Sequence, residues 1–249
     1  MSVEEPGSFE GLLGIHEGLI RTPEVDATGD ALHPGRLCPP QRWMPTFEPL
    51  QAYQAVDPAE LELGGHESFH HVPDADLDRA ILHVVHTEGP VHFQVLADRL
   101  LTAAGVSRLG SRIRERIVSH LDALEASGSL ERHDDFAARG QQYLVPRFRD
   151  WTEAPEKTRE LDHVHDSELM LCLFRAVLNH ERADVDTVMN DGIYAIGFIR
   201  LTESARDRLR PPLATLRETA MVSEINGQLM LGREAMLRQP GERQAGPSL

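Results

Sequence analysis

The sequence predicts a mainly α-helical protein with small β-hairpins, which is an α+β fold class. Three observations lead to this prediction. The chain aligns with itself when it is shifted by 92 residues, each aligned copy has apolar residues at helical spacing followed by a hairpin signal, and the two ends lack such periodicity. The 249 residues leave room for two domains of about 100 residues each.

The two ends of the chain are expected to be irregular. Residues 1–45 mix Gly, Pro and acidic residues, as in Pro6-Gly7, and are expected to form a flexible acidic tail. Residues 46–76 are expected to be an extended lead-in that lies against another part of the chain. Residues 233–249, which end in Gly, Pro and polar residues, are expected to be a second flexible tail.

Between these ends, the repeat sets the expected domain boundaries. The shift aligns Gly105 with Gly197 and continues over more than fifty positions without a gap. The two domains are expected at residues 77–150 and 167–232, joined by a linker over residues 151–166. Three arginines of the first copy align with three of the second: Arg108 with Arg200, Arg114 with Arg206, and Arg116 with Arg208.

The first copy begins with a helix that is predicted from apolar residues three and four positions apart, from Leu77 to Val85. Pro90 cannot continue a helix, and Val91-His92 are expected to form a short extended step. A second helix is expected to end at Gly105, and a third is expected over residues 109–126.

Two strands, over residues 129–133 and 142–145, are expected after the third helix, on either side of a turn at Asp134-Asp135. Helix, short strand, helix, long helix and hairpin is the order of a winged helix. The first copy is therefore predicted to be a winged-helix domain.

The second copy repeats this order, so the chain is predicted to hold tandem winged-helix domains. Its hairpin surrounds Asn226-Gly227, a pair preferred in two-residue turns. Pro211-Pro212 falls inside the third helix of this copy and predicts a kink or a restart there. The helices are expected over residues 167–178, 185–195 and 201–218.

Three segments of the first copy resemble a known family. They are residues 88–92, Glu-Gly-Pro-Val-His, residues 97–100, Ala-Asp-Arg-Leu, and residues 105–113, Gly-Val-Ser-Arg-Leu-Gly-Ser-Arg-Ile. The family is an uncharacterised domain near the C-terminus of large bacterial superfamily 1 helicase-like proteins. Those proteins often also carry an endonuclease-like domain. The resemblance spans about residues 50–150 and, more weakly, the second copy. It implies a DNA-processing context, and a helicase or nuclease protein encoded nearby as the partner.

This chain departs from the family's usual setting because it has no Gly-x-x-x-x-Gly-Lys-Ser/Thr phosphate loop. Any motor is therefore expected to be another polypeptide. The net charge of −15 excludes a general basic coat for DNA. Residues 1–76 hold fourteen acidic residues and three arginines, so the rest of the chain is nearly balanced and leaves room for a local basic face.

The basic start of the third helix is the candidate nucleic-acid site, because this element reaches bases and phosphates in helix-turn-helix folds. The alternative is that its arginines pair with acidic residues on neighbouring helices or in the N-terminal third. A weaker second site is expected at Arg200, Arg206 and Arg208, which lie beside Glu203 and Asp207. The residues of the first site are Ser107, Arg108, Ser111, Arg112, Arg114 and Arg116.

No catalytic, metal or cofactor site is expected. His66-Glu67-Ser68-Phe69-His70 matches a zinc-protease pattern, but the glycines before it and Pro73 after it leave too little room for the required helix. His92 is expected to pack inside the fold, and Cys172 to be a buried thiol.

The leading hypothesis is a non-enzymatic tandem winged-helix module that assists a DNA helicase or nuclease and contacts nucleic acid or the motor protein. One alternative is an acidic assembly subunit that resembles the tandem winged-helix bridging subunits of chromosome-organising ATPases. Another is a transcription regulator that dimerises. The sequence leaves open whether the chain binds DNA and whether it forms a homodimer. No membrane contact is expected, and the protein is expected to be cytoplasmic.

Overall fold

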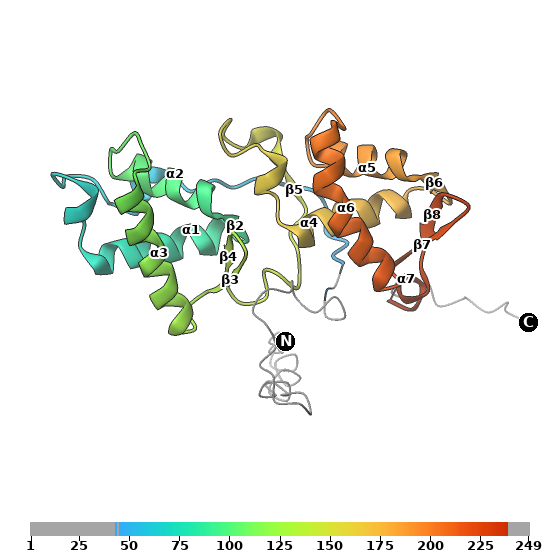
Figure 1. Cartoon of the computed structure of the whole chain (residues 1–249), viewed down its shortest axis with the longest axis horizontal. Helices are drawn as coiled ribbons and strands as arrows, with labels where there is room; N and C mark the ends of the chain where they lie inside the picture. The colour runs from blue at the N-terminus through green and yellow to red at the C-terminus, as the bar shows by residue number, and fades with distance from the viewer. Residues whose placement is uncertain (1–42, 44, 239–249) are drawn as a thin grey trace, which may run out of the picture. The chain divides into compact units, whose positions relative to one another are not determined.

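The computed structural model describes residue 43 and residues 45–238 (Figure 1). Almost all of the expected tail over residues 1–45, and the last eleven residues, lie outside the described residues. The described part contains seven α-helices and three small sheets, which agrees with the predicted α+β class. No helix in this part is long and apolar enough to cross a bilayer.

The first copy contains three helices and a three-stranded sheet. Its strands hydrogen-bond in the order β2-β4-β3, and all neighbours are antiparallel. The elements are α1 (Asp74–Glu88), β2 (Val91–His92), α2 (Phe93–Ala103), α3 (Ser111–Ala126), β3 (Glu131–His133) and β4 (Phe136–Ala138).

The second copy has the same composition, with a separate antiparallel sheet in the order β6-β8-β7. The elements are α4 (Asp166–Leu178), β6 (Ala183–Asp184), α5 (Val185–Tyr194), α6 (Glu203–Glu218), β7 (Val222–Ile225) and β8 (Gln228–Leu231).

The predicted repeat is confirmed by the element boundaries and by the strand register. The three helices and the strands β2 and β4 of the first copy each begin 92 residues before their counterparts. Val91 pairs with Ala137 in the first sheet, and the equivalent residues Ala183 and Leu229 pair in the second. The same apolar spacing therefore folds the same way twice, because it buries the same helix faces against the sheet.

Each copy has its own apolar core. In the first, Leu77, Ile81 and Val84 of α1 pack with Ile117 and Leu121 of α3. In the second, α4 lies at the centre and is buried along almost its whole length, including Cys172, as expected. α1 buries a single apolar stripe against its core, whereas α4 is apolar on more than one face because other elements cover it.

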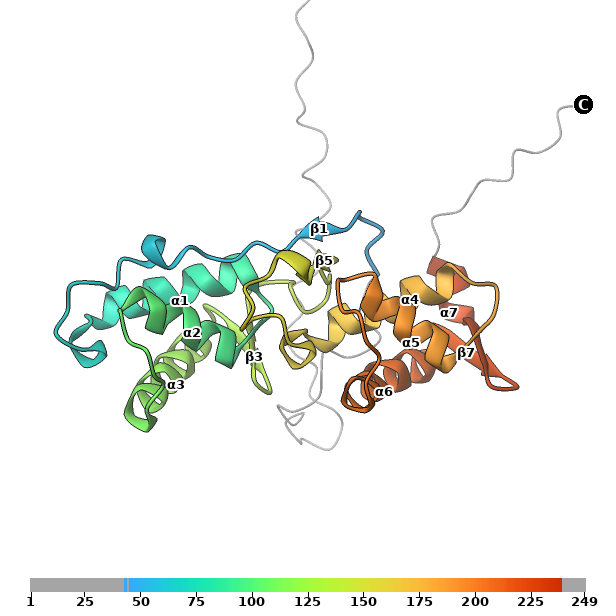
Figure 2. The ribbon, with the colours of Figure 1, turned by 90° about the horizontal axis from the view of Figure 1, so that it is seen from above.

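The lead-in lies against the repeat, as expected (Figure 2). Its strand β1 (Gln51–Ala52) pairs in parallel with β5 (Arg149–Asp150), which precedes the second copy. Two short 3-10 helices, η2 (Pro58–Leu61) and η3 (Phe69–His71), follow β1. Trp43 was expected in the flexible tail, but its ring is buried against Phe174 of α4.

The hairpin of the first copy differs from the prediction. β4 covers residues 136–138, and residues 142–145 form a turn instead of a strand. The reason is that a two-residue turn at Asp134-Asp135 pairs His133 directly with Phe136. Tyr143 then folds back and donates from its hydroxyl to the carbonyls of Glu131 and Phe136, at 3.1 and 3.0 Å.

Pro211 and Pro212 do not restart the second copy's third helix. α6 is one helix over residues 203–218 with both prolines inside it. Leu209, Leu213 and Leu216 are buried on its inner side, and this packing outweighs the two missing backbone donors.

The expected linker and the expected C-terminal tail also hold regular structure. The linker contains two 3-10 helices, η4 (Trp151–Glu153) and η5 (Leu161–His163), each with a buried residue. Residues 233–238 form the short helix α7 (Arg233–Arg238) instead of a flexible tail. Ala235 is buried there, and Glu234 N donates to the Ala220 carbonyl at 3.1 Å.

Candidate nucleic-acid interface

The start of α3 has unused capacity for binding anions. Gly110 is the N-cap and provides no side-chain acceptor, and the first turn of the helix contains no acidic residue. The first amide groups of a helix point outward and carry a partial positive charge. Ser111, the first helical residue, is exposed at this end. A phosphate could therefore accept hydrogen bonds from the backbone here.

Two of the predicted arginines lie free beside this helix start. Arg108 and Arg112 are exposed, and neither side chain forms an ion pair or a hydrogen bond with any described residue. Ser107 is exposed immediately before them. Arg114 is also exposed and stacks its guanidinium 4.5 Å from the centre of the Phe93 ring, which holds the side chain near the surface.

Arg116 has a different environment and is not available to a ligand. Its guanidinium donates to the carbonyls of Phe69 and Val72, both at 2.5 Å, and to the Asp74 carboxylate at 2.7 Å. These bonds join α3 to the lead-in and to the start of α1. The hydrogen bond from Arg116 also lowers the pKa of Asp74 below its usual value.

Equivalent contacts recur in the second copy. Arg208 donates to the Val164 carbonyl at 2.6 Å and pairs with Asp166, and these residues are 92 positions after Val72 and Asp74. Because equivalent residues make this contact in both copies, we interpret it as part of the fold that the two copies share. Arg116 and Arg208 are therefore structural residues in both copies.

At the expected second site, the start of α6 is already capped and is therefore not open to an anion. Thr202 caps α6 by accepting from Ala205 N at 3.2 Å, and Glu203 is acidic in the first turn. Arg206 pairs with Asp186 at 3.0 Å. Only Arg200 of the three predicted residues is exposed without an ion pair among the described residues.

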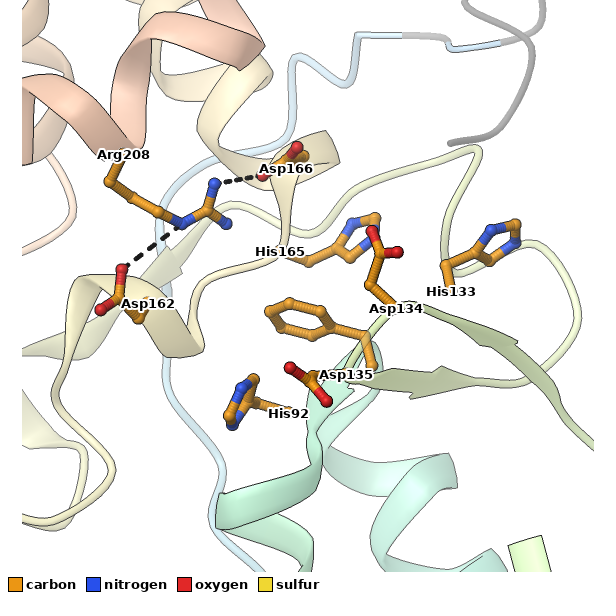
Figure 3. Close-up of a pocket in the computed structure, with 9 residues that line it drawn as sticks. His92, His133, Asp134, Asp135, Asp162, His165, Asp166 and Arg208 are labelled. Atoms are coloured by element: carbon orange, nitrogen blue, oxygen red, sulfur yellow. Dashed lines mark hydrogen bonds and ion pairs between the residues drawn. The ribbon is translucent and has the colours of Figure 1, made fainter. Parts of the chain in front are cut away.

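The hairpin of the first copy is acidic at its tip and borders a pocket of about 280 Å³ (Figure 3). Burial and the neighbouring His163 lower the pKa of His92 to about 4, and burial lowers that of His165 to about 3. Both rings are therefore neutral near pH 7, and the pocket is acidic apart from Arg208. The lining residues are His92, His133, Asp134, Asp135, Phe136, Asp162, His165, Asp166 and Arg208.

The arrangement gives these histidines structural roles. His92 Nδ1 accepts from Gln94 N at 3.2 Å and so caps α2, and its ring stacks 4.6 Å from that of His163. His165 caps α4 in the same way through Ser167 N. Among the described residues, no group of three His, Cys, Asp or Glu is placed to hold a metal ion.

The zinc-protease pattern does not lie on an α-helix. Residues 64–68 are irregular, and the 3-10 helix η3 begins only at Phe69. His66 and His70 are both exposed. The glycines and Pro73 break the helical geometry that would place two histidine ligands on one face.

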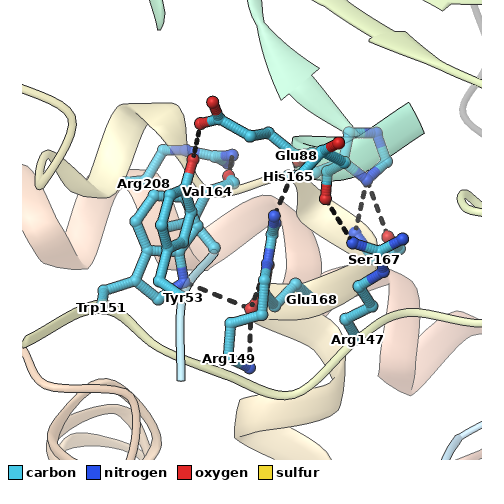
Figure 4. Close-up of polar contacts among 11 residues, drawn as sticks. Tyr53, Glu88, Arg147, Arg149, Trp151, Val164, His165, Ser167, Glu168 and Arg208 are labelled. Atoms are coloured by element: carbon cyan, nitrogen blue, oxygen red, sulfur yellow. Dashed lines mark hydrogen bonds and ion pairs between the residues drawn. The ribbon is translucent and has the colours of Figure 1, made fainter. Parts of the chain in front are cut away.

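A buried polar network joins the two copies (Figure 4). Arg149 pairs with Glu168 at 2.5 Å and donates to the Glu88 carbonyl at 2.8 Å. Glu88 also pairs with Arg99 at 2.8 Å and accepts from the Tyr53 hydroxyl at 2.6 Å. Burial and the Glu88 charge raise the pKa of Tyr53, so the phenol stays protonated. The network fixes the end of α1 against the beginning of α4.

Comparisons with known proteins connect part of the first copy to a protein family. A family model described as "Protein of unknown function (DUF3320)" matches residues 67–115. Residues 67–115, in the first copy, are therefore similar to an uncharacterised domain. No curated protein and no solved structure matches.

The DUF3320 match covers η3, α1, β2, α2 and the first residues of α3. It includes the free residues Ser107, Arg108 and Arg112, and it includes Glu88 and Arg99 of the buried network. Part of the first site therefore lies in the matched domain, whereas the second copy lies outside the match.

Sequence reasoning missed two exposed apolar residues in the second copy. Tyr194 and Ile199 lie in and after the last turn of α5, on the surface. The repeat alignment contained the signal, because it places them opposite Thr102 and Ser107 of the first copy. A polar pair in one copy and an apolar pair in the other indicates that the two surfaces have diverged.

Proposed function

We propose that this chain is a non-enzymatic module of two winged-helix domains, whose first domain contacts nucleic-acid phosphates through the start of α3. It would act beside a helicase or nuclease. The observation that carries the proposal is the unpaired, exposed pair Arg108 and Arg112 at an uncapped helix start.

The winged-helix assignment is supported by the order and the pairing of the elements. α2, a turn and α3 follow one another as in a helix-turn-helix, and β2, β4 and β3 form a small sheet with a hairpin at its edge. In such domains the helix after the turn enters the major groove with its N-terminal residues foremost. Ser107, Arg108 and Arg112 occupy that part of α3.

The difference between the two copies supports assigning the contact to the first. Gly110 and Ser111 at the start of α3 correspond to Thr202 and Glu203 at the start of α6. The first pair leaves the helix start open and positive, whereas the second pair caps it and adds a negative charge.

The acidic hairpin restricts the kind of contact that this proposal allows. Asp134 and Asp135 form the tip of the hairpin and would be repelled by the phosphates of an adjacent groove. The hairpin therefore stays away from the duplex, and the contact is limited to the start of α3. A few phosphate contacts of this kind give weak binding that depends little on base sequence.

Fluorescence anisotropy with a labelled DNA duplex tests the proposal. The wild-type chain is expected to bind at about 50 mM salt, and Arg108→Ala/Arg112→Ala to lower the log–log salt slope by about two units. Arg200→Ala, at the position equivalent to Arg108, is the matched control and should leave the slope unchanged. Equal effects of both variants, or no binding by the wild type, would refute the proposal.

An assembly role is the second candidate, and the apolar surface of the second copy favours it. Tyr194 and Ile199 are 66 and 81% exposed and line the same surface hollow, and exposed apolar residues that lie together often mark a protein–protein contact. A chain that only bridges other proteins would keep this surface and show no DNA affinity in the same titration.

A further inference from the structure

Two histidines at the contact between the copies are N-caps of helices (Figure 3). His92 precedes α2, and its Nδ1 atom accepts from Gln94 N at 3.2 Å. His165 precedes α4, and its Nδ1 atom accepts from Ser167 N at 3.1 Å. An imidazole that accepts through Nδ1 is neutral and carries its proton on Nε2, because the imidazolium ion has two donors and no acceptor. Both caps therefore exist only while the rings are unprotonated.

The two rings are enclosed by residues from both copies and from the linker. His165 is 3% exposed, and its ring centre lies 4.9 Å from that of Phe136 and 4.8 Å from that of Tyr143, two residues of the first copy. The ring centre of His92 lies 4.6 Å from that of the linker residue His163. A proton taken up by either ring would therefore place a charge inside the contact that holds the copies together.

The charges that face His92 oppose one another. Burial has the largest effect on this ring, and together with His163 and Arg208 it favours the neutral form, whereas Asp135 of the hairpin and Asp162 of η5 favour the protonated form. The net result is that the pKa of His92 is lowered to about 4.

The charges that act on His165 are basic. Burial is again the largest cause, and with these neighbouring charges it lowers the pKa of His165 to about 3. One of the neighbours, Arg149, joins the copies through Glu168, so a protonated His165 would also repel the centre of the buried network. The basic neighbours are His133, Arg149 and Arg208, and two further acidic residues that line the pocket are Asp134 and Asp166.

These lowered pKa values make the stability of the folded chain depend on pH. The unfolded chain binds a proton at each histidine below about pH 6.5, the ordinary pKa of this side chain. The folded chain does so only below about pH 4 at His92 and about pH 3 at His165. The contribution of the two rings is therefore complete above about pH 6.5 and decreases as the pH falls from that value towards 4, because the unfolded state then binds more protons.

We propose that this histidine cluster is a pH-sensitive joint, which holds the two copies together while its rings are neutral and releases them when His92 and His165 are protonated. Protonation removes both caps and places a cation at the N-terminus of a helix, where the helix dipole opposes it. Each copy has its own apolar core, so the copies separate before either core unfolds. The proposal does not depend on DNA binding by the first copy.

A pair of substitutions removes the titration and keeps the caps. In His92→Asn/His165→Asn, each asparagine still offers a side-chain oxygen to the helix. Between pH 7 and pH 5, the Tm of the wild type is expected to fall by at least about 5 °C more than that of this variant. The matched control is His66→Asn/His70→Asn, which replaces two exposed histidines and should follow the wild type.

Two measurements on the wild type test the joint directly and do not require the variant to fold. In an NMR titration of the 13 histidines, at least two imidazoles should keep a pKa below about 5. In small-angle X-ray scattering at several protein concentrations, the radius of gyration should increase between pH 7 and pH 4.5, while circular dichroism shows that the helices are retained.

Three results would overturn the proposal. The first is a fall in Tm for His92→Asn/His165→Asn as large as that of the wild type. The second is a titration in which every imidazole has a pKa near 6.5. The third is a wild type that stays equally compact at pH 4.5, or one that loses its helices in the same step in which it expands.

Discussion

At the scale of single residues, arginines that look alike in the sequence have opposite roles. Arg112 and Arg116 lie one helical turn apart on α3, yet Arg112 is free and Arg116 donates to three internal acceptors. The difference comes from the lead-in, which places the carbonyls of Phe69 and Val72 beside one guanidinium only. Net local charge therefore overstates the basic surface that a ligand can reach.

Arg116→Ala is expected to destabilise the protein by about 2 kcal/mol, because it leaves two carbonyls without a charged donor. Arg112→Ala should change the free energy of unfolding by less than about 0.5 kcal/mol, as for an exposed residue without partners. Urea denaturation followed by circular dichroism measures both values. Equal destabilisation by the two variants would contradict the structural role of Arg116.

At the scale of elements, α3 and α6 share their length and position but differ in their first residues. Gly110 has an extended backbone with φ −83° and ψ 162°, and a Cβ added there would meet no other atom. A threonine can therefore replace it without strain. The uncapped start of α3 costs stability that the capped start of α6 does not.

Transplanting the second copy's cap is expected to separate stability from binding. Gly110→Thr/Ser111→Glu should raise the free energy of unfolding by about 0.5–1 kcal/mol through the cap and the helix dipole. The same change should weaken DNA binding at low salt, because it occupies the open amides and adds a negative charge. Denaturation and anisotropy on one sample measure both effects, and a variant that is stabilised but binds DNA as well as wild type would rule out contact at this helix start.

At the scale of the whole described region, a buried polar network connects the two copies. Arg149 is fully enclosed between the copies, stacks over the Tyr53 and Trp151 rings, and meets both Glu168 and the Glu88 carbonyl. Removing one partner of a buried ion pair leaves the other charge without compensation. We therefore expect the two copies to unfold together only while this network is intact.

Arg149→Met is expected to destabilise the chain by about 3–5 kcal/mol and to split one calorimetric transition into two. The control is Arg79→Met, which removes exposed ion pairs of α1 with Asp76 and Glu62 and should cost less than about 1 kcal/mol. A single transition in Arg149→Met at the wild-type temperature would show that the copies are coupled by other contacts.

The sequence by itself determined the repeat, the helices and the exposed basic start of α3. These features depend on residues close together in the chain, where apolar spacing and turn chemistry act locally. The prediction of the hairpin's second strand at residues 142–145 was wrong. The tight turn at Asp134-Asp135 makes the strand pair with the residues that follow the turn directly, and not with the most β-prone residues nearby.

Only the tertiary structure decided which arginines are free and which distant segments approach one another closely. Arg116 meets Asp74, Arg208 meets Asp166, and Arg206 meets Asp186, partners that are 42, 42 and 20 residues away. The close approach of η4 to the turn between α5 and α6 likewise needs Gly197, because a Cβ there would lie 2.8 Å from Thr152 N. Partners so distant in sequence are chosen by packing of the cores, and a local pattern carries no information about which charge that packing brings into contact.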